Sequence, residues 1–177
     1  INNADTDGDG VSDYDEVFVV FSDPLVADFD GTVTLVTSLT GSSYTDALGD
    51  WYKIGGVLFS RSLRGHVDYT ITTVDSGSFR LDITGGQNNA HSTEQRFELN
   101  LYVDGQFVGK DYIEAAYPNS GTVSFYLPYL AAGEHTVRIE WLNGEPGSSL
   151  KLEQIDVLEL GGADLEANGV VDWLDSH

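Results

Sequence analysis

Acidic residues occupy alternate positions near the N-terminus, and a glycine and a glutamate follow them at fixed distances. A hard cation needs about six to eight oxygen ligands, and a loop of about twelve residues supplies them from its positions 1, 3, 5, 7, 9 and 12. Gly10 stands at position 6, where such a loop turns sharply. The spacing predicts a Ca²⁺ site rather than a Mg²⁺ site, because Mg²⁺ requires a tight octahedron. The candidate ligands are Asp5, Asp7, Asp9, the backbone carbonyl of Val11, Asp13 and Glu16.

The same spacing recurs near the C-terminus, between residues 164 and 175, with Gly169 at the turn. Both segments are EF-hand-like loops. The second has an aspartate at position 12, whose shorter side chain makes bidentate coordination weaker than a glutamate would. We predict a second Ca²⁺ site here, the alternative being an acidic tail. The candidate ligands are Asp164, Glu166, Asn168, the backbone carbonyl of Val170, Asp172 and Asp175.

The N-terminal stretch also carries a partial second copy of the acidic pattern. Residues 5–31 resemble the calcium repeats of thrombospondin type 3, in which acidic residues alternate before a glycine. Asp28 and Asp30 fit positions 1 and 3 of the second copy, but Thr32 stands where a third acid belongs. These two aspartates either complete a further Ca²⁺ site or are ordinary loop residues.

The composition excludes several classes of partner. The chain has 177 residues and a net charge of −21, with 29 acidic against 8 basic residues. Nucleic acids and anionic membranes both need a basic face, so neither is expected as a partner. The sequence contains no cysteine, which excludes disulfides and thiol chemistry. Its apolar runs are too short to span a bilayer, which takes about 18 residues or more.

The compartment follows from the predicted metal. Calcium loops stabilise a chain without disulfides where free calcium is millimolar, which is outside cells. We therefore expect a secreted or cell-surface bacterial protein. The sequence does not begin with methionine, so a processed or excised fragment of a larger polypeptide is expected.

Between the two acidic segments the hydrophobic pattern has the period of two that is typical of strands. Examples are Phe79, Leu81 and Ile83, with turn signals between the runs. About eight or nine strands are expected, at 33–39, 56–60, 66–74, 78–84, 96–103, 106–109, 122–127, 135–142 and 150–160. Asp104-Gly105 predicts a tight hairpin, and a change of phase near Glu153 predicts a bulge. The fold class is an all-β antiparallel sandwich.

Five stretches of this region carry a family resemblance. In order, they are GHVDYTI at 65–71, GSFRLDI at 77–83, LYVDG at 101–105, AGEHTVRI at 132–139 and LKLEQI at 150–155. They resemble the strand series of family 6 and family 35 carbohydrate-binding modules, which are galactose-binding-like jelly rolls. The resemblance implies a jelly-roll sandwich over 32–161, flanked by calcium segments at 1–31 and 162–177. It also implies carbohydrate binding, for which Trp51 and Tyr117 are the candidate aromatic contacts.

One feature of those families is missing: they often have an asparagine before the last core strand, where this chain has Ser149. Their usual sugar site therefore does not transfer directly. No catalytic motif is present, so we expect no enzyme activity. His66 and His135 fall on expected strands, where surface or core roles are commoner than metal ligation.

Two functions remain open. The first is a carbohydrate-binding module that attaches a larger secreted or surface protein to a polysaccharide. The second is a structural spacer or adhesion module, stiffened by Ca²⁺ and without a small ligand. In either, we expect a monomer that contacts neighbouring domains of the same polypeptide. The two calcium segments are expected to pack together at one end of the sandwich through Phe18, Phe21, Trp173 and Leu174.

Overall fold

The structure is a computed structural model of the whole chain, and it describes most of the sandwich and parts of the N-terminal segment. The described residues are 4–6, 12–15, 17–18, 29–60, 64–88, 96–115, 117–141 and 149–162. Among them, no helix is long and apolar enough to cross a membrane.

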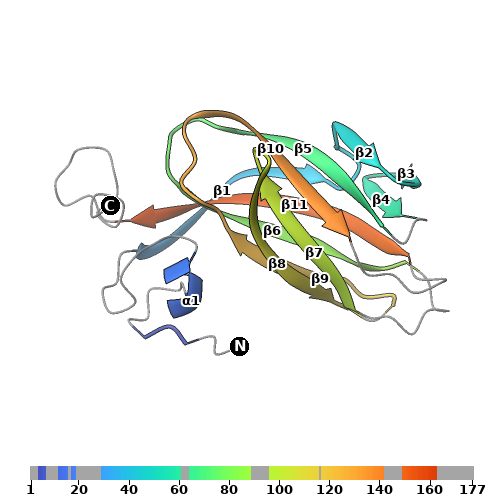
Figure 1. Cartoon of the computed structure of the whole chain (residues 1–177), viewed down its shortest axis with the longest axis horizontal. Coiled ribbons are helices and arrows are strands. Elements are labelled where there is room, and N and C mark those ends of the chain that lie inside the picture. Colours follow the sequence, from blue (N-terminus) through green and yellow to red (C-terminus); the bar gives the residue numbers. More distant parts are fainter. Residues whose placement is uncertain are drawn as a thin grey trace.

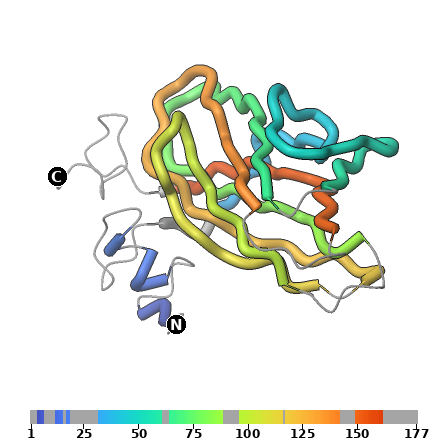
Figure 2. The backbone as a smooth tube through the Cα atoms, turned by 45° about the vertical axis from the view of Figure 1, so that its right-hand side comes forward, coloured from blue at the N-terminus to red at the C-terminus, as the bar shows by residue number. Residues whose placement is uncertain are grey.

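Two antiparallel sheets pack face to face, as Figures 1 and 2 show. The six-stranded sheet has the order β3-β4-β11-β6-β9. Its sixth strand, β1, pairs with the part of β11 that β4 does not reach. The five-stranded sheet has the order β2-β5-β10-β7-β8. The first sheet consists of β1 (Phe29–Thr40), β3 (Trp51–Ile54), β4 (Val57–Ser60), β6 (Ser78–Gln87), β9 (Gly121–Tyr126) and β11 (Leu150–Gly162). The second consists of β2 (Asp46–Leu48), β5 (Gly65–Thr73), β7 (Arg96–Val103), β8 (Gln106–Glu114) and β10 (Gly133–Trp141).

The alternating sequence pattern creates the core between the sheets. Successive strand residues point to opposite faces, so every second side chain is buried. On β7, for example, Phe97, Leu99 and Leu101 are buried, whereas the residues between them lie on the outer face. Among the described residues, the largest buried side chain is that of Trp141 on β10, whose ring lies 5.3 Å from that of Phe97 in an edge-to-face arrangement. The predicted all-β sandwich is thus confirmed.

The strand count is higher than the sequence indicated, because the described part of the chain contains eleven strands. The two unexpected strands, β2 and β3, have only three and four residues, which is too short for a period of two to be recognised in the sequence. Strand β8 continues to Glu114, beyond the expected end at 109. Its outer positions are exposed, so its hydrophobic pattern is weak.

Two local predictions are confirmed. Asp104 and Gly105 have φ of 50° and 80°. Val103 pairs with Gln106 across this turn, as in a tight two-residue hairpin. The register between β11 and β6 shifts between Leu152 and Gln154, which places the bulge at Glu153.

The bulge lies where β11 changes partner along one of its edges. Leu152 pairs with β4, whereas Gln154 pairs with β1. At the change, the N–H of Gly41 donates to the carbonyl of Glu153 at 2.8 Å. A Cβ atom at Gly41 would collide with the carbonyl of Leu152, so only glycine fits there. The buried hydroxyl of Tyr69, on the opposite sheet, donates to the Gly41 carbonyl at 2.8 Å.

The two ends of the sandwich chain meet. Phe29, the first residue of β1, pairs with Gly162, the last residue of β11. A short helix, α1 (Asp13–Asp15), lies at this same end of the sandwich (Figure 1). The ring of Phe18 lies 4.9 Å from Tyr14, which is the i to i+4 contact of a helical turn. Phe21, Trp173 and Leu174 lie outside the described residues, so their expected packing stays a prediction.

We predict that Tyr69→Phe lowers the free energy of unfolding by about 1–2 kcal/mol, because the buried Gly41 carbonyl loses its donor. Chemical denaturation measures the change, and Tyr129→Phe, at a partly exposed tyrosine, is the matched control. Equal stability of the two variants would mean that the bond does not hold the junction.

Asp104 and His135 form a second link, between the β7–β8 turn and β10. His135 contacts the Asp104 carboxylate at 2.7 Å through Nδ1 and the Ala131 carbonyl at 2.8 Å through Nε2. The hydrogen bond to Asp104 raises the pKa of His135, against the opposing effect of burial. Burial raises the pKa of Asp104, but hydrogen bonds from His135 and Thr136 outweigh it and leave that pKa lowered.

These shifts predict a pH-dependent contribution to stability. The contribution of His135 to stability is complete below the pKa of an unfolded histidine, about 6.5. It is lost as the pH rises through the higher pKa of His135 in the folded protein. The contribution of Asp104 to stability is complete above about pH 4. It is lost as the pH falls through the lower pKa of Asp104 in the folded protein. We expect Asp104→Asn to cost about 0.5–1 kcal/mol near pH 5.5 and less at pH 8.5. Asparagine tolerates the positive φ, so the turn is preserved. The same cost at both pH values in thermal melts would contradict the assignment.

Candidate functional site

The outer face of the five-stranded sheet carries two rows of mostly polar and aromatic side chains, and each strand contributes one residue to each row. Each row is fixed by the cross-strand register. The first row is Asp46, Asp68, Arg138, Tyr102 and Phe107. The second row is Leu48, His66, Glu140, Asn100 and Lys110.

A cavity of about 350 Å³ opens on this face, at the β10–β7 junction. Its lining combines an aromatic ring, a guanidinium, a carboxylate and a hydroxyl with one glycine. The lining residues are Tyr102, Gly105, Thr136, Arg138 and Glu140.

Arg138 is held in place by a bidentate ion pair. Its Nε and Nη2 donate to the two carboxylate oxygens of Asp68 at 2.7 and 2.8 Å. The Asp68 side chain is 9% exposed and that of Arg138 is 43% exposed. This hydrogen bonding raises the pKa of Arg138 further, against the effect of burial. Because two hydrogen bonds hold the planar guanidinium of Arg138, it is ordered before a ligand binds. Its remaining N–H groups lie beside the cavity and can donate to a ligand.

Glu140 is ordered by two neighbours on β7. Its Oε2 accepts hydrogen bonds from the Asn100 amide and the Tyr102 hydroxyl, both at 3.3 Å. Burial and the charge of Glu140 raise the pKa of Tyr102, so its hydroxyl stays a neutral donor. The Tyr102 ring lies 5.4 Å from that of Phe107, which is 58% exposed. A half-buried tyrosine and an exposed phenylalanine thus border planar hydrogen-bonding groups.

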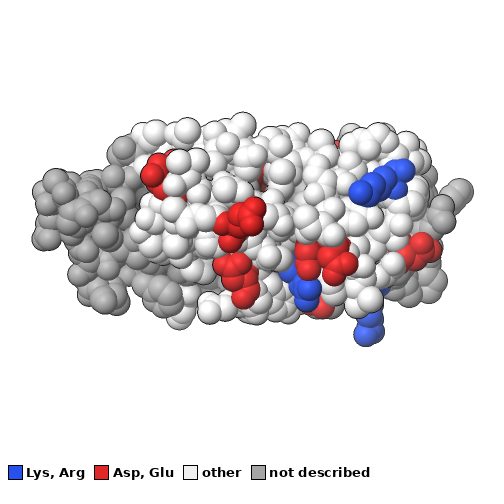
Figure 3. Space-filling model, turned by 90° about the horizontal axis from the view of Figure 1, so that it is seen from above, with Lys and Arg blue, Asp and Glu red and all other residues white. Residues whose placement is uncertain are grey.

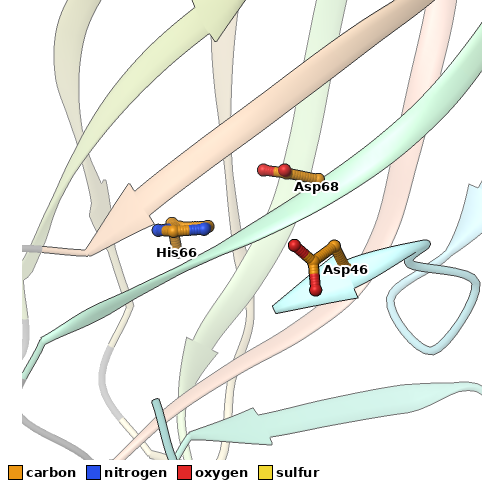
Figure 4. A group of neighbouring side chains, drawn as sticks. All are labelled: Asp46, His66 and Asp68. Atoms are coloured by element: carbon orange, nitrogen blue, oxygen red, sulfur yellow. The ribbon is translucent and has the colours of Figure 1, made fainter. Parts of the chain in front are cut away.

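Beside the cavity, toward the β2 edge, three metal-competent side chains converge. Ligand atoms of Asp46, His66 and Asp68 all lie within 4.8 Å of one another. Figure 4 shows Asp46 on β2 and the other two side chains on β5, on the same face of the sheet. Asp68 belongs both to this group and to the ion pair of Arg138.

The chain as a whole is acidic, with a net charge of −21. In the view of Figure 3, more Asp and Glu side chains than Lys and Arg side chains are visible among the described residues. A surface of this kind repels anionic polymers and leaves neutral ligands unaffected.

The two aromatic residues expected to contact sugar lie elsewhere. Trp51 is on β3, where its half-buried ring packs against the core and its Nε1 donates to the Leu48 carbonyl at 3.0 Å. Tyr117 is 50% exposed and precedes a cis peptide bond to Pro118, in the loop that leads into β9. Strands β3 and β9 form opposite ends of the main path of the six-stranded sheet, so the structure does not bring these two side chains together.

Most predicted calcium ligands lie outside the part of the chain that the structure describes. Asp5 and Asp13 are described, as is the backbone of Asp30 in β1. The Asp13 carboxylate accepts hydrogen bonds from the N–H and the hydroxyl of Thr6, both at 2.8 Å, and the Asp13 N–H donates to Ala4. Positions 1 and 9 of the predicted loop are therefore close, and each Asp13 oxygen keeps a lone pair for a cation. The set of Ca²⁺ ligands in this loop stays a prediction.

The sequence pattern did not predict the residues on this sheet face as a site, because each of them occupies an ordinary polar position on a strand. Tyr102, Arg138 and Glu140 alternate with core residues, which identifies them as outward-facing. Their grouping depends on which strands are neighbours, and the sequence pattern does not specify that. The outward phase of these strands is the only signal that could have found them.

No protein-family model matches the sequence. No curated protein sequence matches it either. Solved structures do match its fold. One example is a family GH115 4-O-methyl-alpha-glucuronidase with specificity for decorated arabinogalactans. Two others are carbohydrate-binding modules, one from Cellvibrio mixtus lichenase 5A in complex with cellotriose and one of family 35 from Cellvibrio japonicus.

The glucuronidase match has a TM-score of 0.53 at 12% identity over 71% of this chain. The match to the lichenase module has a TM-score of 0.51 at 15% sequence identity and covers 70% of this chain. The match to the family 35 module has a TM-score of 0.50 at 14% sequence identity and covers 75% of this chain. The matched region covers only 18% of the glucuronidase but 97% and 99% of the two modules. The fold is thus the β-sandwich found in these carbohydrate-binding modules, as the strand series indicated.

Proposed function

We propose that this galactose-binding-like β-sandwich is a non-catalytic carbohydrate-binding module, and that a glycan binds over the cavity on its five-stranded sheet. The cavity itself is the observation that carries the proposal. It combines an aromatic edge, Tyr102 with Phe107, and two pre-ordered planar groups, Arg138 and Glu140.

Sugar rings have apolar C–H faces and a rim of hydroxyl groups. An exposed aromatic ring contacts the faces, while a guanidinium and a carboxylate bind hydroxyls as donor and acceptor. Because Arg138 and Glu140 are held by Asp68 and Tyr102, binding costs little side-chain entropy. The solved modules with this fold, one in complex with cellotriose, support the same function.

The charge favours a neutral polysaccharide. The net charge of −21 and the acidic surface repel uronic acid polymers, whereas neutral glycans pay no such penalty. Arg138 does not offset this repulsion, because its charge is already paired with Asp68.

The position of the chain ends supports a binding module over a spacer. A spacer in series needs the chain to enter at one end and leave at the other. Here Phe29 pairs with Gly162, so the chain enters and leaves the sandwich on neighbouring strands. A module attached at one end leaves its sheet face free for a glycan. We further propose a secreted or cell-surface location, as part of a larger polypeptide.

The flanking segments are proposed to bind Ca²⁺ and to stabilise the point where both ends leave the sandwich. The first site uses Asp5, Asp7, Asp9, Val11, Asp13 and Glu16, and the second uses residues 164–175. Asp28 and Asp30 are close in sequence to the start of β1, and they either complete a site or remain loop residues.

Binding is tested by affinity gel electrophoresis with Ca²⁺ present, on a panel of neutral polysaccharides (glucan, xylan, mannan, galactan) and anionic ones (pectin, alginate). We expect retardation on a neutral polysaccharide. Tyr102→Ala should weaken it about tenfold or more, because the loss of an aromatic contact costs roughly 1–2 kcal/mol. Tyr129→Ala, at a tyrosine outside the cavity, is the matched control.

Trp51→Ala and Tyr117→Ala complete the series, because they test the loop positions against the sheet face. Loss of binding in these variants but not in Tyr102→Ala would place the sugar away from the cavity. The absence of retardation on every polysaccharide, with a large calcium-dependent rise in melting temperature, would favour the spacer.

Calcium stabilisation is tested separately, by thermal melts with millimolar Ca²⁺ and with a chelator. Ca²⁺ at about a hundred times its Kd should add about 2.7 kcal/mol to the stability of the folded state. We expect Glu16→Gln and Asp175→Asn each to reduce the rise in melting temperature. Asp75→Asn, in the exposed β5–β6 turn, should leave it unchanged. A melting temperature indifferent to the chelator would contradict both proposed sites.

A further inference from the structure

We propose that Asp46, His66 and Asp68 form a binding site for a divalent transition metal ion such as Zn²⁺, separate from the calcium segments and from the glycan cavity. The site lies where the short edge strand β2 pairs with β5. The proposal does not depend on glycan binding, because it concerns other atoms and another ligand.

The backbone places the three ligands with little freedom. Asp46 and Asp68 face each other directly across the β2–β5 pair, and His66 is two residues before Asp68 on the same face. Nitrogen and oxygen ligands of Zn²⁺ lie about 2.0–2.2 Å from the ion, so two ligands of one ion are at most about 4.4 Å apart. The three ligand atoms lie within 4.8 Å of one another, a spread that small side-chain rotations bring to coordination distance.

Two of the three ligands have no competing bond. Among the described residues, the side chains of Asp46 and His66 make no hydrogen bond or ion pair, although His66 is half-buried. Two carboxylates and an imidazole at this distance, without bonds to one another, leave room between them for an ion. His135, by contrast, bonds directly to Asp104 at 2.7 Å and is therefore not available to a metal.

Asp68 is oriented for ligation by Arg138. Metal-binding carboxylates are commonly hydrogen-bonded by an outer group that fixes their orientation. Arg138 occupies one lone pair on each Asp68 oxygen, and each oxygen has a second. The guanidinium therefore acts as a positioning group for the Asp68 carboxylate.

The surrounding charge favours a divalent cation. Glu140 pairs with His66 across the β5–β10 ladder, so it adds a third carboxylate to Asp46 and Asp68. One guanidinium, Arg138, opposes these three carboxylates. These four side chains together carry a net charge of −2, which a divalent ion neutralises at close range.

The donor set distinguishes this site from the calcium segments. Ca²⁺ and Mg²⁺ take oxygen ligands, whereas an imidazole nitrogen with two carboxylates suits Zn²⁺ and its neighbours in the transition series. Three protein ligands leave at least one coordination position for water or an exogenous group. A bound ion would also join β2, which has only three residues, to the body of the sheet.

The test is isothermal titration of the full chain with ZnCl₂ in millimolar Ca²⁺, which saturates the proposed calcium loops. We expect one Zn²⁺ per chain and a broadened or shifted NMR signal of the His66 imidazole. His66→Gln and Asp46→Asn should each weaken binding about tenfold or more. His135→Gln is the matched control and should bind Zn²⁺ as the parent does.

Asp46 is exposed, so Asp46→Asn leaves folding intact and keeps the test decisive if His66→Gln does not fold. The proposal is overturned if no Zn²⁺ binds in the presence of Ca²⁺. It is also overturned if binding is unchanged in Asp46→Asn while the His66 signal stays in place, because the ion would then occupy another site.

Discussion

The strand register is the constraint on which the rest of the structure depends. In a strand, side chains alternate between the two faces, so a slip by one residue would exchange every inner side chain for an outer one. The buried rows, such as Val67, Tyr69 and Ile71 on β5, prevent this slip because exposing them would cost several kcal/mol. The same register places the outer side chains, including His66 and Asp68, opposite fixed partners.

In the six-stranded sheet, strand β11 fixes the register of the three strands that pair with it. It pairs with β6 along one edge and, along the other, first with β4 and then with β1. The bulge at Glu153 lets the strand change partner without losing the burial of Leu152 and Ile155. Gly41 closes the junction because no side chain fits against the Leu152 carbonyl. Tyr69 joins this point to the other sheet.

Charge is used differently in the two parts of the molecule. In the sandwich, acidic groups at important positions have specific partners, as Asp68 has Arg138 and Asp104 has His135. In the flanking segments, acids are concentrated at a spacing that suits a bound cation better than an ion pair. Among the described residues, the side chains of Asp46 and His66 have no hydrogen bond or ion pair, and with Asp68 they form the proposed transition metal site.

The sequence by itself determined the fold class, most strands, the Asp104-Gly105 hairpin and the bulge at Glu153. These depend on local periodicity and turn chemistry, which neighbouring residues carry among themselves. It also determined the two acidic spacings, whose ligands come from a single short segment. Strands β2 and β3 were missed because they are too short to show a period.

Only the tertiary structure decided the sheet-face cavity and the Asp46–His66–Asp68 group. Arg138 and Asp68 are 70 residues apart, and Asp46 comes from an edge strand that the pattern did not reveal. Their meeting depends on strand order, which is set by long-range packing of the core. Alternation shows that a residue points outward, but it does not show which residue lies beside it.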